Sequence, residues 1–312
     1  MKVIVYEKFG GIDVLQTVEV PKPSINSNQV LVKVKAVSIN PMDWKIRKGE
    51  MKLMSGAKFP KRIGIDFAGI VEEIGNDVTN FKRGDEVFGA VNGMKEGALG
   101  EFVAVPSTAL SLKPSNLSFS QAASITITGV GAYQAMVDIA SVNSNSQVLI
   151  NGATGGVGMF AIQIAKQRGA TVTAVSNTEG IEYAKKWGAD VALDYTKTNV
   201  LSAGKKYDVL FDLSGKLPFS KAKEILKKKA IYINPAPTPA LIIGSTIKNL
   251  FVGQKNKMLL SAPNQKTIEA LLQAISKGLM IEVSKTFPFT QYKEAYQYAE
   301  KGGFIGKITI EL

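Results

Sequence analysis

The residues best suited to chemistry form a glycine-rich turn at 152–158, which follows a short apolar strand predicted over 148–151. The dinucleotide fingerprint is G-x-G-x-x-G/A between a strand and a helix, and Ala153, Gly155 and Gly158 occupy its three positions. Gly155 lets the backbone approach a pyrophosphate, and Gly158 lets the helix pack on the sheet. The N–H groups and dipole of the helix attract phosphate. The turn predicts a dinucleotide cradle; a loop without a ligand is the alternative.

The chain contains neither cysteine nor histidine. Disulfides and thiolate ligands are therefore excluded, as are Ser-His and Cys-His nucleophiles. A zinc site would need carboxylates alone, which zinc sites in proteins rarely use. We therefore expect no metal, and we expect a bound cofactor to carry most of the chemistry.

Cofactor selectivity is expected at the end of the next strand, about 20 residues after the glycine turn. An acid there would bind the ribose hydroxyls of NAD and repel a 2′-phosphate. This chain has Ser176, Asn177 and Thr178 instead, with no acid before Glu179. Tyr195, just after the next predicted strand, could supply a hydroxyl group to the same site. These residues favour NADPH over NADH, although no lysine or arginine lies in the turn.

The composition is basic, with a net charge of +12 and a pI of about 9.5. The lysines are scattered, and the densest groups, at 185–186 and 221–229, lie among helical apolar residues. Solvated helix faces explain them; the alternative is a cofactor-binding interaction protein that binds RNA through its basic surface with little turnover. The sequence contains no run of about 18 apolar residues, so it predicts no membrane-spanning helix. We expect a cytoplasmic enzyme.

The pattern of predicted strands and helices differs between two parts of the chain. Short strands dominate the first part, whereas strands alternate with helices after a long helical segment that begins behind Ser118. This organisation predicts an α/β protein with a β domain from residues 1–120 and 260–312 and a doubly wound parallel-sheet domain from 121–259. Strands are expected at 30–37, 69–74, 86–91, 101–105, 171–175, 191–193, 209–213, 230–234 and 307–312, and a helix at 119–140.

Four separated motifs resemble one family, the medium-chain dehydrogenase/reductase superfamily. They are the glycine turn, NPMDWKIRKG at 40–49, GIDFAGIVEEIG at 64–75 and GKI at 306–308. Within that superfamily they resemble the zinc-free quinone oxidoreductases (zeta-crystallin-like), and most closely the chloroplast-type alkenal/quinone reductases. The resemblance implies a GroES-like β-barrel catalytic domain, a Rossmann domain, NADPH between them and a possible homodimer. The two catalytic zinc ligands of other members correspond here to Asn40 and Ile65.

The resemblance also implies a set of cofactor contacts in this chain. It implies that Asn40 and Pro41 lie near the nicotinamide, that Thr128 approaches it, and that Gly131 stands where relatives have a threonine. The other implied contacts are Ala153, Thr154, Gly155, Gly156 and Val157 at the pyrophosphate, Ser176, Asn177 and Tyr195 around the ribose and its phosphate, Ser214, Asn234 and Pro235 at the strand ends, Phe251 and Val252 over the nicotinamide, and Lys307 at the pyrophosphate.

Several of these positions have simpler structural interpretations. Asn40 and Pro41 are also compatible with an ordinary turn, and Asp43 is expected to bind its own backbone there. Lys45 and Arg47 are expected in solvent. Lys307 is compatible with a surface charge.

A metal-free reductase suits acceptors that stabilise the incoming charge themselves. A quinone or an α,β-unsaturated carbonyl delocalises the charge of an incoming hydride, so the protein mainly has to align the reactants. We therefore predict hydride transfer from NADPH to such a small molecule. Asn40 and backbone N–H groups are candidate oxyanion donors, and solvent is the expected proton source.

Overall fold

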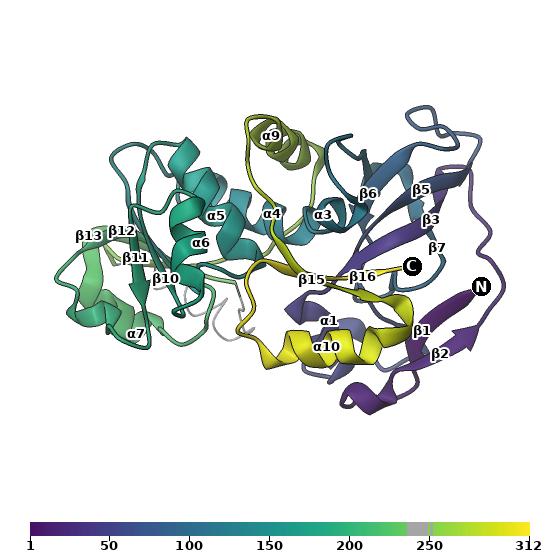
Figure 1. Ribbon diagram of the computed structural model, residues 1–312, viewed down its shortest axis with the longest axis horizontal. Helices are drawn as coiled ribbons and strands as arrows, with labels where there is room; N and C mark the ends of the chain where they lie inside the picture. Colours follow the sequence, from purple (N-terminus) through teal and green to yellow (C-terminus); the bar gives the residue numbers. More distant parts are fainter. Residues whose placement is uncertain (236–248, 250–251) are drawn as a thin grey trace. The chain divides into compact units, whose positions relative to one another are not determined.

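The structure is a computed structural model that describes residues 1–235, 249 and 252–312 (Figure 1). The chain forms two compact units. The first contains Met1–Ile127, Pro263–Ile268 and Val283–Leu312, and the second contains Thr128–Ala262 and Glu269–Glu282. This division differs from the expected one mainly at 269–282, because Gln163 of the second unit bonds Met280 in both directions.

The first unit is built mostly from β-strands. Its strands are β1 (Lys2–Tyr6), β2 (Gln16–Glu19), β3 (Gln29–Ser38), β4 (Lys61–Arg62), β5 (Asp66–Ile74), β6 (Glu86–Ala90), β7 (Phe102–Pro106), β8 (Leu110–Leu112), β15 (Val283–Pro288) and β16 (Lys307–Glu311). Its helices are α1 (Pro41–Arg47), α2 (Lys52–Ser55), α3 (Phe119–Ala123) and α10 (Tyr292–Lys301), with 3₁₀ turns η1 (Ile12–Val14), η2 (Ser107–Ala109) and η6 (Phe289–Gln291).

The larger sheet of this unit joins the two ends of the chain. Its strand order is β15-β16-β3-β5-β6-β8, and β7 also pairs with β3; a smaller sheet has the order β2-β1-β4. Strand β16 runs antiparallel to β3 with Thr309 opposite Ser38. The expected return of the C-terminal strand to the β domain is therefore confirmed.

One apolar cluster forms the core of the first unit. Inward side chains of β3, such as Val30, Val32 and Val34, contribute to it at every second position, as a half-buried strand requires. Helix α10 adds Ala295 and Tyr296 to the same cluster, and it lies beside β16 and α1 (Figure 1). Apolar burial of this kind holds α10 on the sheet.

The second unit is a parallel sheet with helices. Its strands are β9 (Gln147–Asn151), β10 (Thr171–Ser176), β11 (Val191–Asp194), β12 (Tyr207–Asp212), β13 (Leu226–Asn234) and β14 (Lys255–Met258). The helices are α4 (Thr126–Tyr133), which the chain enters from the first unit, π-helical η3 (Gln134–Ile139), α5 (Gly156–Gln167), α6 (Gly180–Lys186), α7 (Phe219–Ala222) and α9 (Gln265–Ser276), with 3₁₀ turns η4 (Val200–Ser202) and η5 (Lys223–Ile225).

The strand order of this sheet is β11-β10-β9-β12-β13-β14, and all described pairs are parallel. The chain runs outward from β9 in one direction and then restarts beside β9 with β12. This is the doubly wound order, in which ligands bind at the carboxyl ends of the strands beside the point of reversal. The predicted α/β fold with a doubly wound sheet is confirmed.

The long helical segment predicted over 119–140 is divided into α3, α4 and η3. Ser118 is the N-cap of α3, as predicted: its Oγ accepts from the Gln121 N–H at 3.1 Å. The first helix ends at Ser124, whose hydroxyl donates to the carbonyl of Ser120 at 2.8 Å. Side-chain bonds of this kind compete with the helix ladder. Among the described helices, none is long and apolar enough to cross a bilayer.

Candidate cofactor cradle and buried polar cluster

The glycine turn connects β9 to α5 beside the reversal of the sheet. Gly152 has a φ of 80°, a left-handed conformation that favours glycine. The N–H groups of Gly152 and Ala153 both donate to the carbonyl of Val175, at 3.1 and 3.0 Å. The turn is therefore fixed to the end of β10, at the edge of the sheet where this fold binds dinucleotides.

The two later glycines of the fingerprint have different roles. A Cβ on Gly158 would lie 2.4 Å from the carbonyl oxygen of Ala153, so close packing of α5 on the turn requires glycine there. A Cβ on Gly155 would meet only the carbonyl oxygen of Gly152, at 3.8 Å. The protein itself therefore does not demand glycine at 155, whereas the approach of a ligand would.

The start of α5 is suited to an anion. Gly155 is its N-cap and makes no side-chain cap, and residues 155–157 are half-buried. The first N–H groups of a helix lack intrahelical partners and carry partial positive charge. This end of the helix can therefore bind phosphate through its backbone.

The three residues expected around the ribose lie together at the ends of β10 and β11. The Ser176 hydroxyl shares a hydrogen bond with that of Thr154, which links the strand end to the glycine turn. The Asn177 Oδ1 accepts from the Gly180 N–H at 3.0 Å. Tyr195, which is 57% exposed, donates its N–H to the carbonyl of Ser176 at 3.0 Å.

An acid that was not among the predicted site residues also lies at these strand ends. Asp194 pairs with Ser176 in the parallel ladder and accepts the hydroxyls of Thr178 at 2.6 Å and Thr196 at 2.7 Å. The Thr178 hydrogen bond is the main cause that lowers the pKa of Asp194 to about 2. Lys197 lies 3.6 Å from this carboxylate. Asp194 could have been found from its place at the end of the next predicted strand. Parallel neighbouring strands end at the same edge of a sheet, so the end of β11 lies beside the end of β10.

The other predicted cofactor contacts of the second unit differ in position and burial. Ser214 follows β12 beside the glycine turn; its hydroxyl donates to Asp212 at 2.7 Å and accepts from Asn151 at 2.9 Å. Asn234 ends β13, followed by Pro235, and both are half-buried. Thr128 is 4% exposed and Val252 is 44% exposed. Phe251 lies outside the described residues.

In the first unit, Asn40 lies at the centre of a buried polar cluster. It is 1% exposed. Its Nδ2 donates to Asp66 at 3.0 Å and to the carbonyl of Ser38 at 3.3 Å, and its Oδ1 accepts from Lys307 at 2.7 Å. Both amide hydrogens are therefore engaged by protein acceptors, which leaves the side chain no spare donor for a substrate oxygen in this arrangement.

Asn40 and Pro41 also begin a helix. Pro41 is the first residue of α1, a position where its missing N–H costs nothing. Asp43 accepts the Asn40 N–H at 2.8 Å, which confirms the expectation that Asp43 orients its own backbone. Ile65, the second position corresponding to a zinc ligand in relatives, is an apolar side chain that is 3% exposed.

Burial changes the acidity of the charged groups in this cluster. It raises the pKa values of Asp43 and Asp66 to about 7, and it lowers the pKa of Lys307 to about 8. Lys307 is 3% exposed, so the interpretation as a surface charge is wrong. Its Nζ donates to the carbonyl of Ile39 at 2.8 Å as well as to Asn40. Asp66 was not among the predicted site residues.

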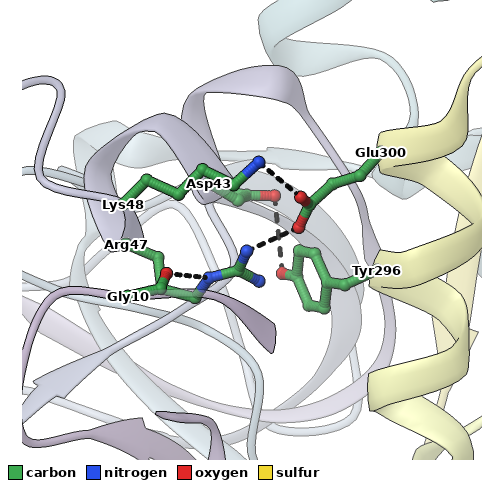
Figure 2. Close-up of polar contacts among 6 residues, drawn as sticks. All are labelled: Gly10, Asp43, Arg47, Lys48, Tyr296 and Glu300. Carbon is green, nitrogen blue, oxygen red and sulfur yellow. Dashed lines mark hydrogen bonds and ion pairs between the residues drawn. The ribbon is translucent and has the colours of Figure 1, made fainter. Parts of the chain in front are cut away.

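The prediction that Arg47 is solvated is also wrong. Its side chain is fully buried, and its Nη2 lies 2.6 Å from Glu300, which also binds Lys48 at 2.6 Å (Figure 2). Its Nε donates to the carbonyl of Gly10 at 3.3 Å. The ion pair joins α1 to α10.

Comparisons with known proteins agree with this geometry. Residues 26–115 match the model of the alcohol dehydrogenase GroES-like domain, and residues 187–310 match that of zinc-binding dehydrogenase. The chain is 35% identical to the chloroplastic NADPH-dependent alkenal/one oxidoreductase of Arabidopsis thaliana, over 99% of this chain and 79% of that relative. It belongs to the medium-chain dehydrogenase/reductase superfamily.

Other members of this superfamily cover the chain even more completely. The chloroplast envelope quinone oxidoreductase homologue of Arabidopsis thaliana is 31% identical over 100% of this chain and 98% of its own. The solved structure of the quinone oxidoreductase from Coxiella burnetii superposes with a TM-score of 0.89 at 31% identity, covering 100% and 99% of the two chains. The GroES-like and Rossmann folds, the resemblance to quinone oxidoreductases and an oxidoreductase activity are thereby confirmed.

Proposed function

We propose that this protein is a zinc-independent reductase that transfers hydride from NADPH to a quinone or an α,β-unsaturated carbonyl compound. The observation that carries the proposal is the uncapped start of α5, reached through a glycine turn at the reversal of the parallel sheet. Relatives named for quinone and alkenal/one reduction support the substrate class.

The residues present fit the cofactor. The open space at Gly155 and the free first turn of α5 suit a pyrophosphate. When bound, NADPH supplies the hydride. We propose that the backbone from 153 to 157 holds the pyrophosphate, that Ser176, Asn177 and Tyr195 surround the ribose phosphate, and that the remaining predicted residues contact the strand-end and nicotinamide portions, namely Asn40, Pro41, Thr128, Ser214, Asn234, Pro235, Phe251 and Val252.

The substrate class follows from the chemistry that the chain lacks. Reduction of a simple ketone develops an alkoxide, which a metal or a strong acid usually stabilises, and the sequence contains no cysteine or histidine to bind zinc. A conjugated acceptor takes the hydride at carbon and spreads the negative charge to its oxygen. A proton from solvent then completes the reduction. We propose backbone N–H groups as oxyanion donors, because the Asn40 amide hydrogens are already engaged.

The metal-free proposal does not use the zinc named in the matched family model. Among the described residues, no group of three or more His, Cys, Asp or Glu side chains lies close enough to hold a metal. The two acids of the Asn40 cluster face an ammonium instead.

We also propose a cytoplasmic protein that acts on small molecules and forms a homodimer. The alternative, an RNA-binding protein with little turnover, is favoured by no contact among residues 1–235, 249 and 252–312.

The test is stopped-flow oxidation of NADPH with 9,10-phenanthrenequinone, with a 2-alkenal, and with a plain alcohol and NADP in the reverse direction. We expect turnover with the first two, no effect of a chelator, and weaker activity with NADH. Efficient turnover with the alcohol alone, or activity that requires added zinc, would overturn the proposal. Salt-sensitive RNA binding without turnover would instead support the alternative.

A further inference from the structure

A buried ammonium lies against the turn between β3 and α1. Lys307 stands at the start of β16, just before the residues that pair with β3. The Ile39 N–H donates to the carbonyl of Ile308 at 3.0 Å, so the backbones of the two segments meet there. The Lys307 side chain then reaches Ile39 and Asn40 through its Nζ, at 2.8 and 2.7 Å.

The charge of this ammonium is balanced inside the protein. A buried lysine is rare unless it is paired, and here the carboxylates of Asp66 and Asp43 are the groups whose charges act on it. Asp66 is fully buried and accepts from Asn40 and from the Ile127 N–H at 3.2 Å. Lys307 and Asp66 therefore lie on opposite sides of the Asn40 amide, one as a donor and the other as an acceptor.

This arrangement determines which way the amide faces. An ammonium has donors only, so it requires the Oδ1 of Asn40, and a carboxylate that accepts requires the Nδ2. Rotating the amide by half a turn would place Nδ2 against the ammonium and Oδ1 against Asp66. Both contacts would then be unfavourable, and buried polar groups would lose their partners.

We propose that Lys307 is a positioning residue of the reductase, whose ammonium, opposed by Asp66, fixes the orientation of the Asn40 amide and of the turn into α1. This inference rests on the proposed function, in which Asn40 contacts the nicotinamide. It replaces the pyrophosphate contact that the family resemblance implied for Lys307, because both hydrogen bonds of its Nζ run to the 39–40 turn. It predicts an effect on turnover rather than on cofactor affinity.

The kinetic test compares Lys307→Met with Lys301→Met, an exposed lysine at the end of α10. For Lys307→Met we expect kcat to fall about tenfold or more while the Kd of NADPH changes less than about threefold, since the lost interaction positions a contact of the reacting ring. The Lys301 variant should match the wild type. A tenfold weaker, salt-sensitive binding of NADPH with unchanged kcat would show a phosphate contact and overturn the proposal.

A second variant keeps the test decisive if Lys307→Met does not fold. The double variant Lys307→Met/Asp66→Asn removes the two opposite charges on either side of the Asn40 amide, so neither is left without the other. We expect it to fold but to retain the low kcat, because an amide at position 66 can pair with either orientation of the Asn40 amide and the ammonium is gone. Wild-type kcat in the folded double variant would contradict the proposal.

A spectroscopic measurement separates this inference from the proposed function. In a ¹⁵N-labelled protein, the Asn40 side-chain amide, assigned by its loss in Asn40→Asp, should be shifted and protected from solvent exchange. In Lys307→Met or the double variant, that protection should fall at least tenfold. An unchanged Asn40 signal would overturn the inference. If the wild type reduced no acceptor, the proposed function would fail while this measurement still decided the role of Lys307.

Discussion

At the scale of single residues, environment decides what each polar side chain can do. Asn40 and Asn177 are both asparagines predicted to contact the cofactor. Asn40 is held by three partners inside the first unit, whereas Asn177 uses its Oδ1 to accept the Gly180 N–H. The Asn40 amide is therefore held by charged partners on both sides, whereas the contact of the Asn177 oxygen with Gly180 is one that a carboxylate can also make.

Asn177→Asp should change cofactor preference. The carboxylate can still accept the Gly180 N–H, so the turn should persist, but its charge would repel a 2′-phosphate. We expect the KM for NADPH to rise about tenfold, equivalent to roughly 1.4 kcal/mol, with little change for NADH. Steady-state kinetics with both cofactors measure this. Asn145→Asp, in an exposed turn, is the control, and an equal effect on both cofactors would contradict the interpretation.

The buried acids predict an unusual dependence of stability on pH. Burial raises the pKa of Asp43 from 3.8 to about 7, so the folded state retains a proton that the unfolded chain releases. The folded state binds more protons in this interval, and stability therefore falls as the pH rises from about 4 to about 7. Asp66 acts in the same direction.

Thermal unfolding between pH 5 and pH 7 checks this expectation. Acids with lowered pKa values, such as Asp194 and Glu300, have their effect at lower pH and do not interfere in that interval. The Tm should decrease from pH 5 to pH 7, and Asp43→Asn should reduce the slope. The exposed Asp77→Asn should leave the slope unchanged. A Tm that rises over this interval would refute the assignment.

At the scale of elements, the turn from β9 into α5 shows two separate reasons for glycine. At Gly158 the reason is packing of the helix on the turn, since a Cβ would lie 2.4 Å from the Ala153 oxygen. At Gly155 the nearest atom would be 3.8 Å away, and the proposed reason is space for the cofactor. Folding and cofactor binding can therefore be separated within one turn.

The two alanine substitutions should accordingly give opposite results. Gly158→Ala should destabilise the protein by roughly 1–3 kcal/mol, because overpacking forces the backbone to shift. Gly155→Ala should leave the free energy of unfolding nearly unchanged and weaken NADPH binding. Urea unfolding and calorimetric titration measure the two effects. Gly11→Ala, which meets nothing within 4 Å, is the control; reversed effects at 155 and 158 would refute this division.

At the scale of the whole molecule, contacts between distant parts of the chain hold the first unit together. Strand β16 pairs with β3, and Arg47 of α1 bonds Glu300 of α10 across 253 positions of sequence (Figure 2). The Arg47 side chain is fully buried, whereas Glu300 is 19% exposed and also binds Lys48, so loss of Arg47 removes buried hydrogen bonds and packing rather than isolating a buried charge.

Arg47→Met should therefore destabilise the protein by about 1–3 kcal/mol. Lys48→Met removes the other partner of Glu300, but Lys48 is 38% exposed, and exposed pairs contribute at most about 1 kcal/mol. Denaturant unfolding of both variants tests the contrast. Equal, small losses for the two would show that the buried pair contributes no more than the exposed one.

The sequence by itself predicted most of the strands and the strand, turn and helix of the proposed cofactor cradle, because these features are local. Alternating apolar residues predicted the strands, and the strand, glycine turn and helix follow one another directly along the chain. The tertiary structure decided the environment of polar groups that lie far apart in sequence. Lys307 and Arg47 are charged residues compatible with solvent in the sequence, but folding buries both. Lys307 lies against the 39–40 turn, and Arg47 lies against Glu300 of α10. Asp194 likewise lies beside Ser176 only because two parallel strands end at one edge. Burial and pairing arise from folding, so no local pattern reports them.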